Sequence, residues 1–329
     1  MGTGTKGIVG IDVSKDKLDV STKDAAGKRR RKSARNTPGG RADLIAWLES
    51  NGLAGATCCH ESTGRYGDAL ADELHAAGFE VRVANPGRVK RFADAMGSRN
   101  KTDASDADVI LEFAALMPPP VWTPPRAEIR SLRALLLVRD GLVGDRAEWA
   151  NRAKAELPGD EASLARLQIA RLDREVDDLD ATISMAIGSD PELSGKRDLL
   201  SSIPGVGAVL AAVFLSLVPE GGFARAKELV AFAGLNPRRV ESGTMRGTTR
   251  ISKVGHGRLR EALYMAAMSG MACNPILAAF AARLKAREGG MAGKAVVVAL
   301  SRKLLTICHG VLRSKRPFEV PAAAPAPAS

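Results

Sequence analysis

The chain has 329 residues, 45% of them apolar, and its 48 Lys and Arg outnumber its 37 Asp and Glu, for a formal net charge of +11 and a pI near 9.7. This length and apolar content suit about two folded domains, and the basic balance favours a polyanionic partner such as nucleic acid. The N-terminus reaches charged residues too early for a signal peptide, and no uninterrupted apolar run approaches the roughly 18 residues of a membrane span, so we expect a cytoplasmic protein with no membrane partner.

The first third of the chain predicts a mixed sheet. GIVGIDV (7–13) is a short apolar run with β-branched residues, and LDVSTKD and GKRRRKSARN continue it as a strand meander. A helix over TPGGRADLIAWLESNG, the strand ATCCHE, the helix RYGDALADELHAAGF and the strand EVRVANP follow. Strands that begin in a hairpin and then alternate with helices are typical of the α/β class.

The proline-rich segment MPPPVWTPPR (117–126) cannot continue a helix and predicts that a first domain, 1–127, ends there. We expect a helical connector over 128–195, because an apolar stripe in it follows the a/d spacing of a coiled coil. That stripe consists of Ala165, Ile169, Leu172, Val176, Leu179 and Ile183. It spans only about three heptads, so packing within the chain and pairing between chains both stay open. A mainly helical second domain is predicted over 196–320, with a disordered tail at 321–329.

Acidic residues recur at the ends of the predicted elements. Asp12 ends the first strand, Glu61 ends the fourth, and Asp103 and Asp106 lie at the start of a predicted helix. Strand ends on one side of a sheet converge, and carboxylates gathered there repel one another unless a hard cation such as Mg²⁺ neutralises them. The set predicts a metal site for phosphoryl transfer, although each acid taken singly is also explained as a turn residue or a helix cap. Asp108 is expected to be a solvated helix residue.

A glycine-rich, basic segment lies between residues 233 and 267. Its serine Ser242 is a candidate nucleophile, although a serine beside glycine is more often a turn former, and the rival Tyr264 lies in a pattern that favours burial. Upstream, the turn PGVG resembles that of a helix-hairpin-helix module, whose backbone N–H groups can face a phosphate. With the basic third strand, these segments supply the predicted nucleic-acid contacts: Arg29, Arg30, Arg31, Lys32, Gly205, Gly207, Arg238, Arg239, Arg246, Arg250 and Lys253.

The four cysteines, Cys58, Cys59, Cys273 and Cys308, lack the spacing of a zinc site or a disulfide framework. We expect reduced and mostly buried thiols.

Six motifs in this order resemble the DEDD-type insertion-sequence transposases, which are bridge-RNA-guided recombinases: GIDVSKDKLDV, CCHESTGRYGD, NPGRVKRFADAMGSRNKTDASDA, LLSSIPGVG, FAGLNPRRVESGTMRG and ISKVGHGRLREALY. The resemblance implies an α/β RNase H/RuvC-like N-terminal domain whose four acids are Asp12, Glu61, Asp103 and Asp106. It also implies a coiled-coil linker and a mainly α-helical C-terminal transposase domain whose nucleophile is Ser242.

The resemblance further implies a serine–DNA intermediate, Mg²⁺, donor and target DNA, a structured guide RNA, dimers that pair into a tetrameric synaptic complex, and a bacterial, nucleoid-associated location. Three other readings stay open. A RuvC-like junction nuclease would use water and ignore Ser242. A non-catalytic nucleic-acid scaffold would not need the acids. An actin-fold phosphotransferase would need a nucleotide loop that the early sequence lacks.

Overall fold

The computed structural model describes residues 7–24, 26–62, 64–97, 103–154, 161–238, 250–286, 290–291 and 293–320. The chain divides into two compact units, Met1–Pro125 and Arg126–Ser329. Each unit has a hydrophobic core of its own, and no core cluster formed by the described residues contains buried residues of both units.

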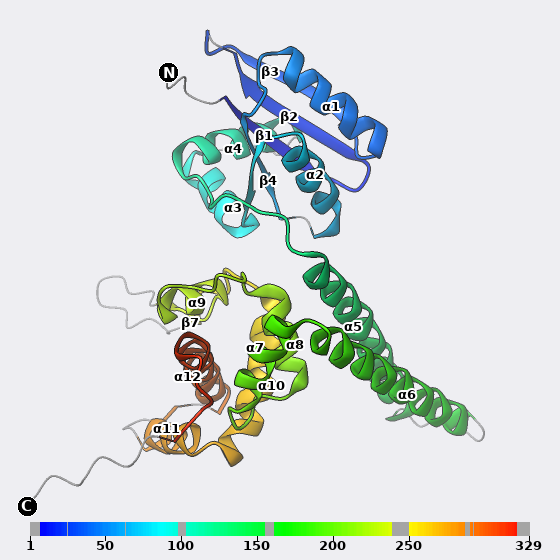
Figure 1. Cartoon of the computed structure of the whole chain (residues 1–329), viewed down its shortest axis with the longest axis vertical. Coiled ribbons are helices and arrows are strands. Elements are labelled where there is room, and N and C mark those ends of the chain that lie inside the picture. The colour runs from blue at the N-terminus through cyan, green and yellow to red at the C-terminus, as the bar shows by residue number, and fades with distance from the viewer. Residues whose placement is uncertain are drawn as a thin grey trace, which may run out of the picture. The chain divides into compact units, whose positions relative to one another are not determined.

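The first unit is built on a five-stranded mixed sheet in the order β3-β2-β1-β4-β5 (Figure 1). β1 (Ile8–Val13), β2 (Lys17–Lys23) and β3 (Arg29–Arg35) form the predicted antiparallel meander. β4 (Thr57–Glu61) pairs parallel with β1, and β5 (Glu80–Ala84) pairs parallel with β4. The predicted α/β class is confirmed, and the sheet is consistent with a RuvC-like domain.

Helices cover both faces of this sheet. α1 (Pro38–Ser50) and α2 (Arg65–Ala76) pack on the face of Val9, Ile11 and Val13. α3 (Pro86–Ala95) and α4 (Asp103–Leu116) pack on the opposite face. Local signals set the helix starts: the side chain of Thr37 accepts a hydrogen bond from Gly40 N ahead of α1, and that of Asn85 accepts one from Gly87 N ahead of α3.

The second unit opens with two long helices, α5 (Ala127–Lys154) and α6 (Glu161–Gly188). Arg139 pairs with Asp180, and seven residues further along α5 Arg146 pairs with Asp173, so the two helices run antiparallel. Within the predicted stripe on α6, Ala165, Leu172 and Ile183 are buried. The stripe therefore packs within the chain, and a coiled coil between chains stays a prediction.

The rest of the second unit is mainly helical, as predicted. Its elements are α7 (Pro191–Ser201), α8 (Ala208–Leu217), α9 (Ala226–Phe232), the two-stranded pair β6 (Pro237–Arg238) and β7 (Arg250–Ile251), α10 (Gly257–Cys273), α11 (Pro275–Lys285) and α12 (Gly293–Ser314). α8 is buried along Leu210–Ser216, which makes it the centre of this core. The long helices also share the core through Leu132, Leu136 and Ile187.

Within the described ranges, one helix has the length and composition of a membrane span, which the sequence analysis did not anticipate. α12 has 22 apolar-rich residues, and α10 with α11 meets the same measure as a pair bent by 94°. α12 carries Arg302 and Lys303 near its middle, and eight of its residues between Val296 and Val311 are buried in the second core.

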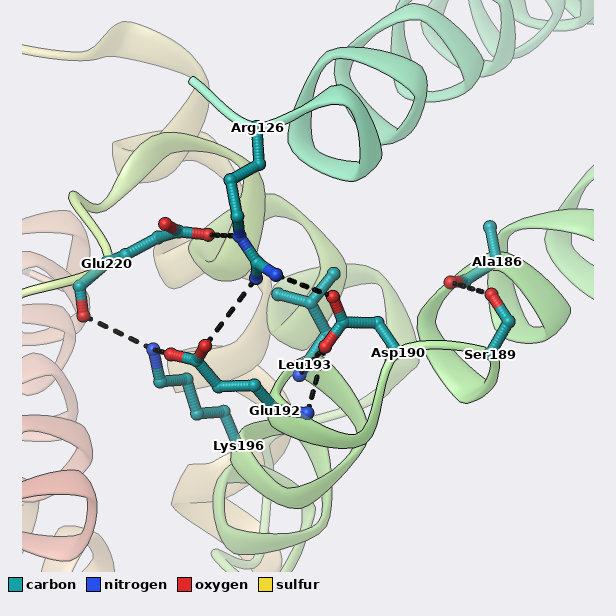
Figure 2. Close-up of polar contacts among 8 residues, drawn as sticks. All are labelled: Arg126, Ala186, Ser189, Asp190, Glu192, Leu193, Lys196 and Glu220. Atoms are coloured by element: carbon teal, nitrogen blue, oxygen red, sulfur yellow. Dashed lines mark hydrogen bonds and ion pairs between the residues drawn. The ribbon is translucent and has the colours of Figure 1, made fainter. Parts of the chain in front are cut away.

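Arg126, at the start of the second unit, forms ion pairs with three acidic residues (Figure 2). Its guanidinium pairs with Asp190 (2.9 Å), Glu220 (2.5 Å) and Glu192 (3.7 Å). Asp190 is also the N-cap of α7, accepting hydrogen bonds from Glu192 N and Leu193 N at 2.8 and 3.0 Å. One side chain thereby ties the entry of α5 to α7 and to the loop that follows α8.

Candidate active site

Two of the predicted acids lie side by side on neighbouring parallel strands. Ile11 of β1 pairs with His60 of β4, so Asp12 and Glu61, the next residue on each strand, occupy the following level of the sheet. Both carboxylate residues are half-buried. Their strands end here, so the two groups lie at the carboxyl edge where open α/β sheets present their sites.

Both acids point to the face that α4 covers. Side chains alternate along a strand, so Asp12 shares its face with Gly10 and Glu61 shares its face with Cys59. A Cβ atom at Gly10 would lie 2.4 Å from the carbonyl oxygen of Ala107, and Cys59 is buried in the cluster formed by α3 and α4. Glycine at position 10 therefore lets α4 rest directly on the backbone of β1.

The direction of α4 follows from two contacts with β2. Ser21 donates a hydrogen bond to Asp108 (2.6 Å), and Lys23 pairs with Glu112 (2.7 Å). α4 therefore runs parallel to β2 and antiparallel to β1. Its first turn lies toward the end of β1 that carries Asp12.

The first turn of α4 holds the other two predicted acids. α4 begins at Asp103, whose side chain lies outside the described part of the chain. Asp106 is half-buried and lies four residues before Ile110, which packs against the sheet, so Asp106 is on the sheet-facing stripe. The topology thus brings all four predicted positions to one end of one face of the sheet.

The described side chains do not form a closed ligand set. No group of three or more His, Cys, Asp or Glu among them is close enough to hold a metal ion. The donor chemistry nevertheless suits a hard divalent cation, because the positions brought together are all carboxylates.

Asp19 and His60 were missed by the sequence analysis. Asp19 of β2 pairs directly opposite Asp12, and it binds Lys17 (2.9 Å) and the hydroxyl of Ser33 (2.7 Å). The signal was available, since Asp12 and Asp19 are equally far from the hairpin turn between them. His60 is buried with Nδ1 2.8 Å from the carbonyl oxygen of Glu61, and burial lowers its pKa, so the ring is neutral at neutral pH.

The expectation for Asp108 was wrong. Its side chain is 14% exposed and is bound by Ser21, Arg29 and Arg31. Burial by itself would raise the pKa of this carboxyl, but the hydrogen bonds from Arg31, Ser21 and Arg29 outweigh burial and hold the pKa below its usual value. Helical periodicity places Asp108 on a helix, but it cannot reveal which strand lies opposite.

The basic third strand has partners within the chain. Arg29 and Arg31 bind Asp108, Arg30 binds Asp24 (3.2 Å) and Asn51 (2.9 Å), and Lys32 lies over the ring of Trp47. Their predicted contact with nucleic acid stays a prediction.

The PGVG turn joins α7 to α8. Gly205 has a φ of 95°, and a Cβ there would lie 2.6 Å from Cα of Gly270, so packing of the turn on α10 explains this glycine. Gly207 is exposed and is the N-cap of α8 without a side-chain cap. A Cβ at Gly207 would meet nothing within 4 Å, so packing does not explain this glycine, and phosphate binding at the turn stays a prediction.

The middle of the basic segment, the loop 239–249, lies outside the described residues, and with it Ser242, Arg239 and Arg246. Its two flanks are described, because Arg238 of β6 pairs with Arg250 of β7 through the backbone. Arg250 and Lys253 are exposed, and Lys253 has a φ of 55°, an uncommon conformation outside glycine. Arg250 and Lys253 are thus exposed at the point where the chain returns from the loop to the folded unit.

Two cations near this loop bind the protein instead. Arg258 donates to the carbonyl oxygen of Leu136 (2.7 Å) and to Asp140 (2.8 Å). Arg260 donates to the carbonyl oxygens of Ala233 and Gly255, and burial lowers its pKa. Both arginines belong to the basic segment 233–267 of the sequence, so part of its positive charge is used within the fold. Tyr264 is half-buried against the second core, as expected.

Comparison with known proteins finds transposase relatives for both units of the chain. A family model of the DEDD type named for IS110, described as Transposase, matches residues 9–159, and one described as Transposase IS116/IS110/IS902 family matches residues 197–282. The chain is 30% identical to the pilin gene-inverting protein of Moraxella bovis over 96% of this chain and 98% of that protein. It is 27% identical to the transposase for insertion sequence element IS1111A of Coxiella burnetii over 78% of this chain and 75% of that protein.

Proposed function

The chain belongs to the DEDD-type IS110 family of insertion-sequence transposases and is a DNA transposase, and from that premise we propose that it cuts and rejoins DNA with the acids of the first unit and Ser242 of the second. The four acids lie within residues 9–159 and Ser242 lies within residues 197–282, so each proposed group is inside a matched region.

One observation carries the proposal for the acids. Asp12 and Glu61 are adjacent at the carboxyl ends of β1 and β4, on the face where α4 starts with Asp103 and Asp106. We propose that these residues hold Mg²⁺, which when bound would neutralise charge on the scissile phosphate and acidify an attacking hydroxyl. The carboxylates supply the negative charge that fixes the cation at this edge.

We propose that Ser242 is the nucleophile. Its Oγ attacks the scissile phosphorus and loses its proton, and the 3′-oxygen of the broken strand leaves as a hydroxyl after taking up a proton. A 3′-hydroxyl of the second duplex then attacks the serine ester, which restores a phosphodiester and frees Ser242. Relatives named for gene inversion support this scheme, because inversion requires that both strand ends be rejoined.

The charge and composition support a guide RNA as the reader of sequence. The net charge of +11 suits a nucleic-acid partner, and 4% aromatic residues leave few side chains for stacking on bases. Base pairing with a structured RNA would supply specificity without them.

We further propose that dimers pair into a tetrameric complex. Leu137, Val138, Leu164 and Leu167 are exposed on α5 and α6, which supports contact between protomers.

The proposal is tested with the full-length protein, its co-purified RNA, end-labelled DNA and Mg²⁺. The wild type is expected to form a protein–DNA adduct that protease removes. Ser242→Ala should lose both adduct and recombination while still binding DNA, and Tyr264→Phe should keep both. Asp12→Asn should stop cleavage, as should EDTA.

The alternatives give different results. Cleavage to free ends by Ser242→Ala at the wild-type rate would indicate a nuclease that uses water. Normal recombination after Asp12→Asn would indicate that the acids take no part in the chemistry.

A further inference from the structure

Asp108 gathers three side chains from the neighbouring strands, and we propose that this Asp108 cluster positions the acidic start of α4 for cation binding. The cluster consists of Ser21 on β2, Arg29 and Arg31 on β3, and Asp108 itself. The inference rests on the proposed function of Asp12, Glu61, Asp103 and Asp106, and it assigns Arg29 and Arg31 a role that differs from phosphate binding.

The contacts of Asp108 occupy both of its oxygens. Ser21 Oγ donates to Oδ1 at 2.6 Å, and Arg31 donates to Oδ1 through Nε at 3.3 Å and to Oδ2 through Nη2 at 2.5 Å. Nη1 of Arg29 is 2.6 Å from Oδ2, and the carboxylate is 14% exposed. A two-pronged arginine contact on a largely buried carboxylate fixes direction as well as distance.

One turn further along α4, Glu112 repeats the arrangement. It pairs with Lys23 (2.7 Å) and Arg29 (2.6 Å), so Arg29 bridges the two acids. Four residues along a helix advance about 6 Å, and two residues along a strand advance about 6.6 Å. The pairs Ser21–Asp108 and Lys23–Glu112 therefore match step for step, and sliding α4 along β2 would break both.

The same contacts fix the rotation of α4 about its axis. Ala107 faces Gly10 of β1, and Asp108, about 100° further round the helix, faces β2 and β3. A helix held at two adjacent residues in two directions cannot turn without losing one contact. Asp106 is next to this pair and the backbone of Asp103 is one turn before Ala107, so these contacts set the position of the first turn of α4.

Arg29 and Arg31 consequently act as positioning residues. If a phosphate took their guanidinium groups, Asp108 would remain in a largely buried place without its counter-charge, which is costly. Their engagement also leaves β3 with less free positive charge than its sequence indicates.

The test measures Mn²⁺ binding to the full-length protein by titration calorimetry and amide hydrogen exchange along α4. Asp108→Asn and Arg31→Gln are each expected to weaken Mn²⁺ binding by about 10-fold or more and to speed exchange in the first turns of α4. The double variant should bind Mn²⁺ about as well as Asp108→Asn alone, because both changes break one contact. Circular dichroism must show folded protein in each case.

Asp43→Asn and Lys28→Gln are matched controls, because they make the same charge changes at exposed residues of α1 and of the turn before β3, outside the Asp108 cluster. Both should keep the wild-type affinity for Mn²⁺. Wild-type affinity in folded Asp108→Asn, with binding abolished in Asp12→Asn, would overturn the positioning role while the metal site stands. No binding of Mn²⁺ by the wild type would instead overturn the proposed metal site, and this inference with it.

A last measurement separates positioning from phosphate binding. Arg31→Gln should leave the salt dependence of binding to a DNA duplex unchanged. A reduction of the logarithmic slope by about 0.9 would identify Arg31 as a phosphate contact and overturn the inference.

Discussion

Burial separates the four cysteines of this protein into three protonated thiols and one exposed thiol. Cys58, Cys59 and Cys308 are buried and Cys273 is exposed, and none of the four forms a disulfide. The prediction of mostly buried thiols is confirmed. Burial raises the pKa of Cys59 and of Cys308 to about 12 and raises that of Cys58 further, so these three remain protonated at neutral pH.

We therefore expect that a thiol reagent such as dithionitrobenzoate labels one cysteine in the folded protein and four after denaturation. Cys273→Ser should abolish the fast native reaction and leave the three slow ones. Rapid labelling of Cys59 in the native protein would contradict the burial on which this expectation depends.

The candidate site shows where residue-level prediction ends. The positions of Asp12 and Glu61 were predictable because each lies in the last two residues of a strand, and their adjacency follows from the parallel pairing of β1 with β4. Asp108 was not predictable, because its partners are 77 and 87 residues away and only the packed helix brings them together. Local pattern identifies the positions of charges, whereas tertiary contact determines whether a charge faces solvent, another side chain or a ligand.

At the scale of elements, helix starts combine local capping with long-range ion pairs. Asp190 caps α7 and also pairs with Arg126. The hydrogen bond from Leu193 N, followed by the charge of Arg126, holds the pKa of Asp190 below its usual value of 3.8. A lowered pKa means that the carboxylate stabilises the fold above the unfolded-state pKa, and that this stabilisation is lost as the pH falls through the lower folded-state pKa.

Asp190→Asn and Asp190→Ala should separate the two roles. Asparagine still accepts the capping hydrogen bonds but loses the charge, whereas alanine loses both, so Asp190→Ala should lower the melting temperature at pH 7 by about 2–4 °C and Asp190→Asn by less. The difference between wild type and Asp190→Asn should shrink as the pH falls below 4. A difference that is constant between pH 7 and pH 3 would contradict an ionised Asp190 in the native state.

Elements were more predictable than their partners. The meander, the α1 start at Thr37 and the helix from Asp103 follow from residue pattern and capping. The apolar stripe on α6 also follows, but whether it meets α5 or another chain is a matter of loop geometry that spacing does not encode. Likewise, pattern placed Arg258 and Arg260 beside a basic loop, while packing turned both toward backbone carbonyls.

At the scale of the whole molecule, the proline-rich segment 117–126 connects the two units, and each unit holds one end of it. This inter-unit connector is distinct from the helical connector predicted over 128–195. In the first, Trp122 N donates to the carbonyl oxygen of Val81 (2.8 Å), and the Trp122 ring packs edge-on against His75. In the second, Arg126 forms the ion pairs of Figure 2. The units are therefore joined through residues 123–125, where two prolines restrict the backbone to extended conformations.

This arrangement predicts that loss of either anchor lengthens the exposed connector. Trp122→Ala should speed cleavage by a nonspecific protease within residues 117–125, because the segment is released from β5. Arg126→Ala should speed cleavage at the start of α5, since that end is no longer tied to α7. In both variants the products should be two stable fragments, each with its own core. Trp149→Ala, on α5 away from the connector, is the matched control and should leave the cleavage rate there unchanged. Equal cleavage rates in the wild type and in both anchor variants would mean that neither Trp122 nor Arg126 restrains the inter-unit connector. The restrained ends of the connector would then not be at these two residues.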